Sequence, residues 1–283
     1  MNTQKRILAV HDISCVGKCS LTVALPIISA AGIETSVLPT AVLSTHTGGF
    51  TGYTYRDLTE DIRPIEDHWE TLGLSFDAIY TGFLGSFEQV EIVSELFDRF
   101  KTKDNLILVD PVMADNGELY SVFTPDFPLE MRKLCAKADV IIPNMTEAHL
   151  MLKKPYKDGP YTKEYIESLL RELAQIGAPK IVLTGVYFDD KTLGAACFDK
   201  EAGKISYAMT PKIEGSYHGT GDVFGSALLS ALLNGKDISA ASQVAADFTA
   251  GSIQRTKDAK TDIRYGVNFE AGIPSLLKAL DII

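Results

Sequence analysis

Short apolar segments alternate with helix-forming segments along most of this 283-residue chain. The apolar segments are mostly continuous runs, without the every-second-residue polar pattern of a strand that is half exposed to water. Continuously apolar strands separated by helices are typical of a parallel sheet whose two faces are both covered. The pattern therefore predicts an α/β protein with a mostly parallel central sheet and helices on both faces.

The chain shows no internal repeat, low-complexity tract or linker, so we expect a single domain over residues 1–283. The expected strands are 6–10, 33–43, 77–81, 106–110, 140–142 and 180–184, followed by a hairpin of 193–198 and 204–209. The expected helices are 20–31, 61–72, 88–100, 126–136, 147–152, 163–176, 223–233, 238–255 and 269–280.

Composition excludes several classes of function. The formal net charge is −10, whereas nucleic-acid phosphates require clustered Lys and Arg, so we expect no nucleic-acid partner. No apolar run approaches membrane length and no secretory signal is recognisable, so we expect a cytoplasmic protein with no membrane partner. The four cysteines show no zinc-type spacing, and reduced thiols are the expected state.

Residues 218–222 read His-Gly-Thr-Gly-Asp and precede a run of helix formers. A glycine-rich turn that opens a helix leaves backbone N–H groups unpaired, and the helix dipole adds partial positive charge there. Together they form a site for phosphate-like anions. Asp222 either caps this helix or lies beside the bound anion as a base, and the second arrangement is what a small-molecule kinase needs.

Polar residues follow four of the expected strands: Asp12, Asp110, Asn144 and Thr184. Ligands of parallel sheets bind beyond the carboxyl ends of the strands, so we expect all four residues to face one crevice. Asp110 could hold a cation or bond its own turn, and the Thr184 hydroxyl could meet a phosphate or close a turn. Asn144 and Glu147 stand three residues apart, a spacing that suits both two oxygen ligands of Mg²⁺ and a helix capping box.

The glycine- and threonine-rich loop 44–53 contains Ser-Thr-His-Thr at its start. Its hydroxyls and the imidazole of His46 could bind a small polar ligand, and a solvated loop is the alternative. Two nucleotide-binding motifs are excluded by spacing. Residues 16–20 lack the Gly-Lys-Ser order of a P-loop, and the glycines at 48, 49 and 52 do not form a dinucleotide fingerprint.

Four segments in order carry a resemblance to a known family: TAVLSTHTG at 40–48, DPVM at 110–113, PNMTE at 143–147 and GTGD at 219–222. Along nearly its whole length the chain resembles the ribokinase-like superfamily and, within it, the pyridoxal kinase family. The resemblance implies a three-layer α/β/α fold and ATP-dependent phosphorylation of the 5′-hydroxymethyl group of pyridoxal, pyridoxine or pyridoxamine. It also implies a homodimer.

The resemblance assigns roles to residues at the matching positions. Asp222 would be the base that accepts the alcohol proton, and the amides of Gly219, Thr220 and Gly221 would form the anion hole. Asp110 and Glu147 would hold Mg²⁺. Asn144, Glu147, Thr184 and Thr220 would contact ATP or its metal, and Asp12, His46, Thr47 and Asp222 would contact the substrate.

The chain departs from the family pattern at three positions. Asp12 stands where the family usually has Ser, and an acid there is closer to the hydroxymethylpyrimidine kinases of the same superfamily. Ala114 replaces a glycine, and Ile142 replaces a frequent Thr, which argues against a monovalent-cation site. A hydroxymethylpyrimidine kinase and a non-catalytic ligand-binding homologue therefore remain as alternatives, and the preferred B6 vitamer is left open.

Overall fold

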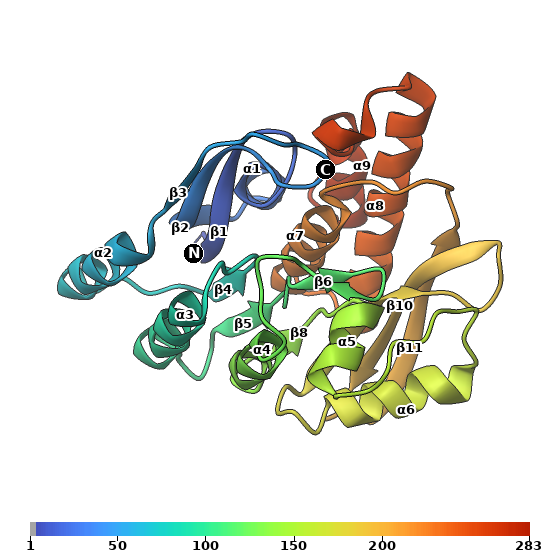
Figure 1. The fold of residues 1–283 in the computed structure, drawn as a ribbon, viewed down its shortest axis with the longest axis horizontal. Helices are drawn as coiled ribbons and strands as arrows, with labels where there is room; N and C mark the ends of the chain where they lie inside the picture. Colours follow the sequence, from blue (N-terminus) through green and yellow to red (C-terminus); the bar gives the residue numbers. More distant parts are fainter. Residues whose placement is uncertain (1–3) are drawn as a thin grey trace. The chain divides into compact units, whose positions relative to one another are not determined.

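The computed structural model describes residues 4–283 (Figure 1). The chain divides into two compact units. The first unit contains residues 4–78 and Ile213–Ile283, so it joins the two ends of the chain. The second unit is the continuous segment Ile79–Lys212. Among residues 4–283, no helix has the length and apolar character that crossing a membrane requires.

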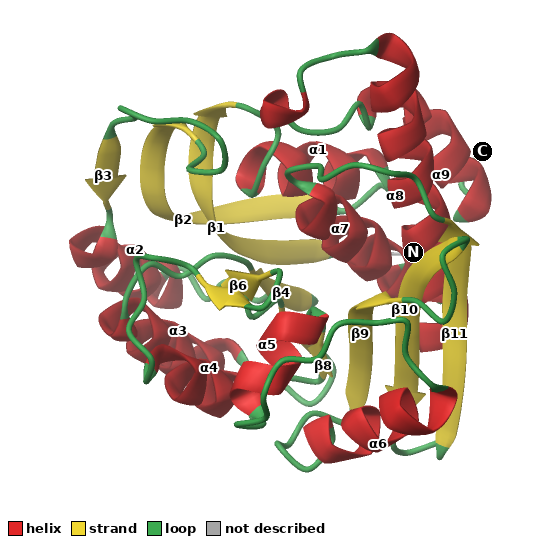
Figure 2. Ribbon diagram, turned by 45° about the vertical axis from the view of Figure 1, so that its right-hand side comes forward, coloured by secondary structure: helices red, strands yellow, loops and turns green. Residues whose placement is uncertain are grey.

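In the first unit, β1 (Arg6–Val16) runs parallel to β2 (Glu34–Thr45), and β3 (Tyr55–Asp57) pairs antiparallel with β2. Helix α1 packs on β1 and against α7, and α7 lies beside α8 (Figures 1 and 2). The helices of this unit are α1 (Leu21–Ala30), α2 (Thr59–Thr71), α7 (Thr220–Leu233), α8 (Ile238–Ala259) and α9 (Ile273–Ala279), with 3-10 turns η1 (Ile263–Tyr265) and η2 (Glu270–Gly272).

Helix α7 is buried almost all round, because its sequence offers small and apolar residues on every side. Its two buried hydroxyls need partners inside the protein. Ser226 Oγ donates to the carbonyl of Asp222 at 2.6 Å, and Ser230 Oγ donates to the carbonyl of Ser226 at 2.7 Å. These bonds to the preceding turn satisfy the hydroxyls without disturbing the packing. They tie the second and third turns of α7 to the turn before each of them.

In the second unit the strand order is β11-β10-β9-β8-β5-β4, with β5, β8 and β9 parallel and β10 antiparallel to both of its neighbours. Helix α6 packs on β9 and β10 (Figure 2). The strands are β4 (Ala78–Thr81), β5 (Leu106–Val109), β8 (Val140–Ile141), β9 (Lys180–Val186), β10 (Thr192–Asp199) and β11 (Lys204–Pro211). The helices are α3 (Phe87–Phe100), α4 (Phe127–Cys135), α5 (Met145–Met151) and α6 (Lys163–Leu173), and β6 (Ala114–Asp115) pairs with β7 (Glu118–Leu119).

The α/β class, the mostly parallel strands and the hairpin of β10 and β11 are confirmed. The largest difference is in β1, which continues to Val16 although the expected strand ended at residue 10. The continuation pairs with β2 past an irregularity at which Asp12 faces two residues of β2, between the pairs His11–Pro39 and Ile13–Val42. A bulge of this kind changes the direction of nearby side chains and is common beside functional sites.

Smaller differences concern short elements and helix ends. Strands β3, β6 and β7 were not expected, because two or three residues carry no periodic signal. Helix α7 begins at Thr220 rather than at residue 223, and α8 extends to Ala259. The segment 269–280, expected as one helix, is a 3-10 turn followed by α9.

Candidate active site

The start of α7 has the geometry of an anion site. Gly219 is the N-cap residue, has a φ of 74° and has no side chain with which to cap the first N–H groups. A Cβ at this position would lie 2.1 Å from the carbonyl oxygen of Lys18 and would clash with it. Only glycine therefore fits here, and the amides of Thr220 and Gly221 at the helix start suit a phosphate-like group.

Asp222 lies in the first turn of α7 and is 9 % exposed. Its Oδ2 atom accepts a hydrogen bond from the backbone N–H of Ser20 at 2.8 Å and one from the Cys19 thiol at 3.3 Å. Burial raises the pKa of Asp222 above its usual value, and these hydrogen bonds partly oppose the shift. A buried carboxylate with a raised pKa beside an anion site suits proton abstraction from an alcohol.

Asp12 belongs to the same cluster as Asp222. The hydroxyl of Ser20 donates to Asp12 Oδ1 at 2.5 Å, and the hydroxyl of Ser14 donates to Oδ2 at 3.3 Å. Burial raises the pKa of Asp12 to about 6, and the negative charge of Asp222 adds to the rise. The first unit thus joins two buried acids through one serine.

Cys19 and Ser20 were not among the residues expected at the site. A serine directly before a helical segment is indistinguishable in the sequence from an ordinary N-cap, so it carried no sign of a contact with two carboxylates. Burial raises the pKa of the Cys19 thiol, with both neighbouring carboxylates adding to the effect, so the thiol stays protonated and donates to Asp222.

His46 connects loop 44–53 to two other segments of the first unit. Its Nε2 atom lies 2.6 Å from the carbonyl oxygen of Arg264, and its Nδ1 accepts from the backbone N–H of Gly48 at 3.1 Å. This pattern requires the neutral tautomer with the proton on Nε2, and burial lowers the pKa of His46 accordingly. A Cβ at Gly17 would lie 2.5 Å from the His46 ring, so the loop packs tightly there.

Aromatic contacts also hold loop 44–53 against residues 264–265 and His218. The Phe50 ring contacts the Tyr265 ring at 5.3 Å between centroids, and the Arg264 guanidinium lies 5.6 Å from the Phe50 centroid. The His46 ring lies 5.2 Å from the ring of His218, the residue that precedes Gly219. Thr47 is exposed, while both ring nitrogens of His46 are engaged within the protein. The assignment of His46 and Thr47 to the substrate stays a prediction.

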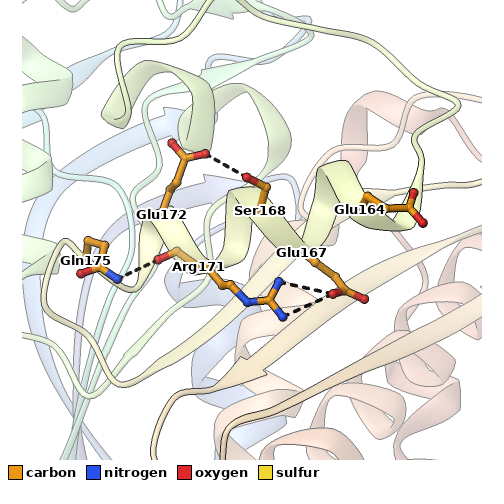
Figure 3. Close-up of a pocket in the computed structure, with 6 residues that line it drawn as sticks. All are labelled: Glu164, Glu167, Ser168, Arg171, Glu172 and Gln175. Atoms are coloured by element: carbon orange, nitrogen blue, oxygen red, sulfur yellow. Dashed lines mark hydrogen bonds and ion pairs between the residues drawn. The ribbon is translucent and has the colours of Figure 1, made fainter.

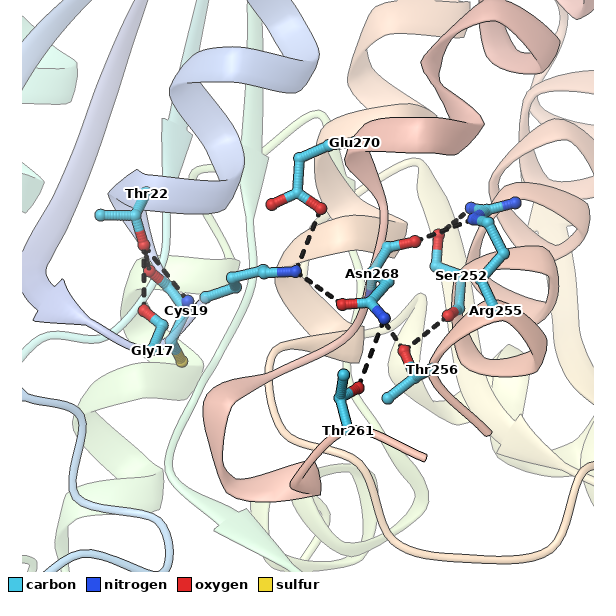
Figure 4. A network of polar contacts seen from close by, with 10 residues as sticks. Gly17, Cys19, Thr22, Ser252, Arg255, Thr256, Thr261, Asn268 and Glu270 are labelled. Carbon is cyan, nitrogen blue, oxygen red and sulfur yellow. Dashed lines mark hydrogen bonds and ion pairs between the residues drawn. The ribbon is translucent and has the colours of Figure 1, made fainter. Parts of the chain in front are cut away.

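Lys18 belongs to the segment whose backbone approaches the Gly219 turn. Figure 4 shows the polar network beside this segment, with Asn268 between Glu270, Thr256 and Arg255. The Nζ atom of Lys18 donates to Asn268 Oδ1 at 2.9 Å and to Glu270 Oε2 at 3.0 Å. The backbone of Asn268 is held in turn by Thr256, whose hydroxyl accepts its N–H at 2.7 Å, and by Arg255, whose Nε donates to its carbonyl at 2.8 Å. A pocket of about 380 Å³ lies against this network and is lined by Lys18, Thr261, Asp262, Tyr265, Gly266 and Asn268.

In the second unit, Asn144 and Glu147 form a capping box at the start of α5. Asn144 Oδ1 accepts from the backbone N–H of Glu147 at 2.9 Å, and Glu147 Oε2 accepts from that of Asn144 at 2.8 Å. Glu147 Oε1 also accepts from the backbone N–H of Met113 at 3.1 Å. The capping-box alternative is therefore what the structure shows. The role of Glu147 as a magnesium ligand stays a prediction.

Asn144 and Glu147 lie beside Thr184 in the second unit, and Asp110 directly follows β5, the neighbour of β8 in the sheet. Thr184 on β9 forms a bridge with Asn144, and its N–H donates to the carbonyl of Pro143 at 2.9 Å. Burial raises the pKa of Cys135, and both Glu147 and Asp110 add to the rise, so both carboxylates lie near this thiol. Asp12 belongs to the first unit, and the expectation that all four post-strand residues face one crevice stays a prediction.

The donor chemistry of Asp110 and Glu147 fits Mg²⁺. Two buried carboxylates offer the oxygen ligands that Mg²⁺ prefers, and this ion usually keeps several waters when protein supplies only one or two ligands. Within residues 4–283 there is no group of three or more His, Cys, Asp or Glu side chains arranged to hold a metal ion.

The second unit also carries a shallow pocket that contains none of the candidate site residues (Figure 3). Side chains of α6 and the turn after it form this pocket, and Arg171 forms an ion pair with Glu167 at 3.3 Å across it. The lining residues are Glu164, Glu167, Ser168, Arg171, Glu172 and Gln175. We interpret it as the solvated face of an amphipathic helix.

The α/β fold, with a glycine-capped helix start and a carboxylate in its first turn, defines a protein of the ribokinase-like class. The model of one protein family, described as phosphomethylpyrimidine kinase, matches residues 28–267. The chain belongs to this family.

Pyridoxal kinases are among its relatives, which confirms the resemblance found in the sequence. The pyridoxal kinase of Lactobacillus plantarum is 32% identical, with a TM-score of 0.89 and coverage of 98% of both chains. A Bacteroides thetaiotaomicron protein, provisionally named a phosphomethylpyrimidine kinase and crystallised with pyridoxal, is 38% identical. It covers 97% of this chain and 96% of its own, with a TM-score of 0.92. The pyridoxal kinase of Dictyostelium discoideum is 25% identical over 278 residues, which are 92% of this chain and 89% of that protein.

Proposed function

We propose that this protein is an ATP-dependent kinase that phosphorylates the 5′-hydroxymethyl group of pyridoxal, pyridoxine or pyridoxamine. The observation that carries the proposal is the position of Asp222. This buried carboxylate lies in the first turn of a helix whose N-cap admits only glycine, so a base and an anion site occur together. The similarity to pyridoxal kinases, and to a structure with bound pyridoxal, supports the choice of substrate.

In the proposed mechanism, Asp222 accepts the proton of the alcohol as the alcohol oxygen bonds to the γ-phosphorus of ATP. The bond from this phosphorus to the β,γ-bridging oxygen breaks, and ADP leaves. The amides of Gly219, Thr220 and Gly221 stabilise the negative charge on the migrating phosphoryl group. Asp12 and Thr47 contact the pyridine ring, and His46 holds loop 44–53 at the substrate. Both nitrogens of His46 are already bonded within the protein, so we infer that it acts mainly by positioning this loop.

The second unit supplies the groups that we assign to the nucleotide. Asp110 and Glu147 would hold Mg²⁺, partly through water, and the ion when bound would neutralise charge on the ATP phosphates. The Thr184 hydroxyl and the Asn144 amide would contact phosphate oxygens or metal-bound water, and Thr220 of the first unit would contact phosphate as well. Because the family model spans residues of both units, we propose that 1–283 form one ribokinase-like domain.

A second candidate function is phosphorylation of hydroxymethylpyrimidine. Two observations favour it: the family model is described for phosphomethylpyrimidine kinase, and Asp12 places a carboxylate where pyridoxal kinases usually have serine. We rank it below the first candidate because the solved relatives at 32% and 38% identity are a pyridoxal kinase and a protein crystallised with pyridoxal. A homodimer is proposed from the family resemblance alone, and the cytoplasmic location stays a prediction.

The test is a substrate panel with ATP and Mg²⁺, read by release of ADP. Pyridoxal, pyridoxine, pyridoxamine and hydroxymethylpyrimidine are compared at equal concentrations, with the Asp222→Asn variant as the matched inactive control. The proposal expects turnover of at least one B6 vitamer at a higher kcat/KM than hydroxymethylpyrimidine. A clear preference for the pyrimidine would establish the second candidate, and ADP release with no alcohol dependence would reject both.

A further inference from the structure

Ser20 contacts two buried carboxylates at once. Its hydroxyl donates to Asp12 Oδ1 at 2.5 Å, and its backbone N–H donates to Asp222 Oδ2 at 2.8 Å. Asp12 lies at the irregularity of β1, whereas Asp222 lies at the start of α7, so the two acids come from distant parts of the sequence. We propose that Ser20 is a positioning residue that orients both acids for the transfer reaction. This inference rests on the proposed function and deepens it.

The backbone of Ser20 supports this role. Ser20 is the N-cap residue of α1, with φ 51° and ψ −125°, a left-handed conformation that favours glycine. A serine at an N-cap usually bonds an N–H of the first helical turn, but the Ser20 side chain makes no such bond and reaches Asp12 instead. Glycine would keep the N–H and relieve the strain. Only the hydroxyl bond to Asp12 would be lost with glycine at this position. Backbone strain of this kind is characteristic of functional sites.

The hydrogen bonds on each carboxylate show which of its two oxygens the protein holds. Ser20 and Cys19 both bond Oδ2 of Asp222, so the segment before α1 leaves Oδ1 for the alcohol proton. Asp12 receives Ser20 on Oδ1 and the longer Ser14 contact on Oδ2, so Oδ2 is the less firmly held oxygen. We assign this oxygen to a polar atom of the substrate ring.

The charged and titratable groups that face Asp12 come from α7, from β3 and from the segment between β1 and α1. Asp222 of α7 repels its negative charge and raises the pKa of Asp12, whereas the Ser20 hydroxyl lowers it. Tyr55 of β3 and the Cys19 thiol also feel the Asp12 charge, which adds to the rise of the pKa of both groups. Removing the Ser20 hydroxyl therefore takes away the hydrogen bond that most favours the charged form of Asp12, while the weaker contribution of Ser14 remains.

Two substitutions separate the hydroxyl from the backbone strain. Ser20→Ala removes the hydroxyl and keeps the strain, while Ser20→Gly removes both, and each retains the N–H that holds Asp222. We expect both variants to lose about ten- to hundredfold in kcat/KM for the alcohol, as is usual for a lost bond to a charged group, with the KM for ATP unchanged. Ser29→Ala, an exposed serine on the same helix, is the matched control and should retain the wild-type rate.

The second readout is the titration of Asp12, followed by carboxyl ¹³C NMR between pH 4 and 8. In both Ser20 variants the pKa of Asp12 should rise above about 6, and Ser29→Ala should match the wild type. An unchanged Asp12 titration, or a Ser20→Gly variant with full activity, would overturn the inference. If the wild type phosphorylates no alcohol, the proposed function fails, and the NMR titration still decides whether Ser20 holds Asp12.

Discussion

Asn144 and Glu147 each bond the other's backbone, with the Asn144 side chain accepting from Glu147 N at 2.9 Å and the Glu147 side chain accepting from Asn144 N at 2.8 Å. The same Glu147 carboxylate also accepts from the N–H of Met113. One side chain thus secures the start of α5 and the segment after β5. Because Glu147 is also a proposed magnesium ligand, its structural and catalytic contributions must be separated by experiment.

Glu147→Gln should separate them. The amide keeps the shape of the side chain but replaces one acceptor oxygen by a donor, so one buried N–H loses its partner, at a cost of about 1–3 kcal/mol in unfolding free energy. If Glu147 also holds magnesium, the Mg²⁺ concentration for half-maximal activity rises as well. Denaturant unfolding and a Mg²⁺ titration of the rate measure the two effects, with the surface variant Glu130→Gln as control. A stability loss with an unchanged Mg²⁺ titration would limit Glu147 to the capping box.

Asp222→Asn should abolish most turnover while the protein remains folded. The substitution removes the proposed base and a buried negative charge, and loss of a general base typically lowers kcat by about 10²–10⁴-fold. The free energy of unfolding should not fall sharply, because the amide oxygen can still accept from Ser20 N. Steady-state kinetics and nucleotide binding by calorimetry measure the outcome. A kcat within threefold of the wild-type value would show that another group accepts the proton.

Gly219→Ala should destabilise the protein and inactivate it. A left-handed φ costs a non-glycine residue about 1–2 kcal/mol, and here the new Cβ would also lie 2.1 Å from the carbonyl oxygen of Lys18. Gly32→Ala is the matched control, since Gly32 has a φ of 80° and no atom within 4 Å of its added Cβ. Thermal unfolding of both variants isolates the cost of the close approach. Equal losses in the two variants would contradict the tight turn at the start of α7.

The pH dependence of stability should report Asp12. Its folded pKa of about 6 lies above its ordinary value of 3.8, so the folded state holds this proton more tightly than the unfolded state. Protonated Asp12 therefore adds to the free energy of unfolding, and this stabilisation is fully present below pH 3.8. As the pH rises towards 6 and beyond, about 3 kcal/mol of it is lost. Urea unfolding at pH 4, 5, 6 and 7 measures the trend.

In the Asp12→Asn variant, the loss of unfolding free energy that Asp12 causes between pH 4 and 7 should disappear. Any pH dependence that remains is assigned to Asp222, because burial raises its pKa as well. Asp247→Asn, which changes an exposed carboxylate, is the control and should follow the wild type. If the Asp12→Asn variant also follows the wild type across this range, Asp12 does not titrate as the structure implies.

Much of the second unit could be predicted from sequence because its strands are short, apolar and bounded by turns. Asp110, Asn144 and Thr184 were expected at strand ends, and the structure places Asn144 beside Thr184 in a bridge. Their facing one crevice stays a prediction. The choice between a metal ligand and a capping box at Glu147 could not be made, since both use the same three-residue spacing. Only the positions of the N–H groups of Met113 and Asn144 show the capping box.

In the first unit, the sequence by itself determined the α/β alternation and the Gly-Thr-Gly-Asp helix start, because periodicity and glycine placement are local properties of the chain. The tertiary structure decided which groups surround Asp222. Ser20, Cys19 and Asp12 lie about two hundred residues away along the chain, and no local pattern encodes a contact at that separation. The folded backbone brings β1 and α7 to the same serine, and burial there raises the pKa of both carboxylates.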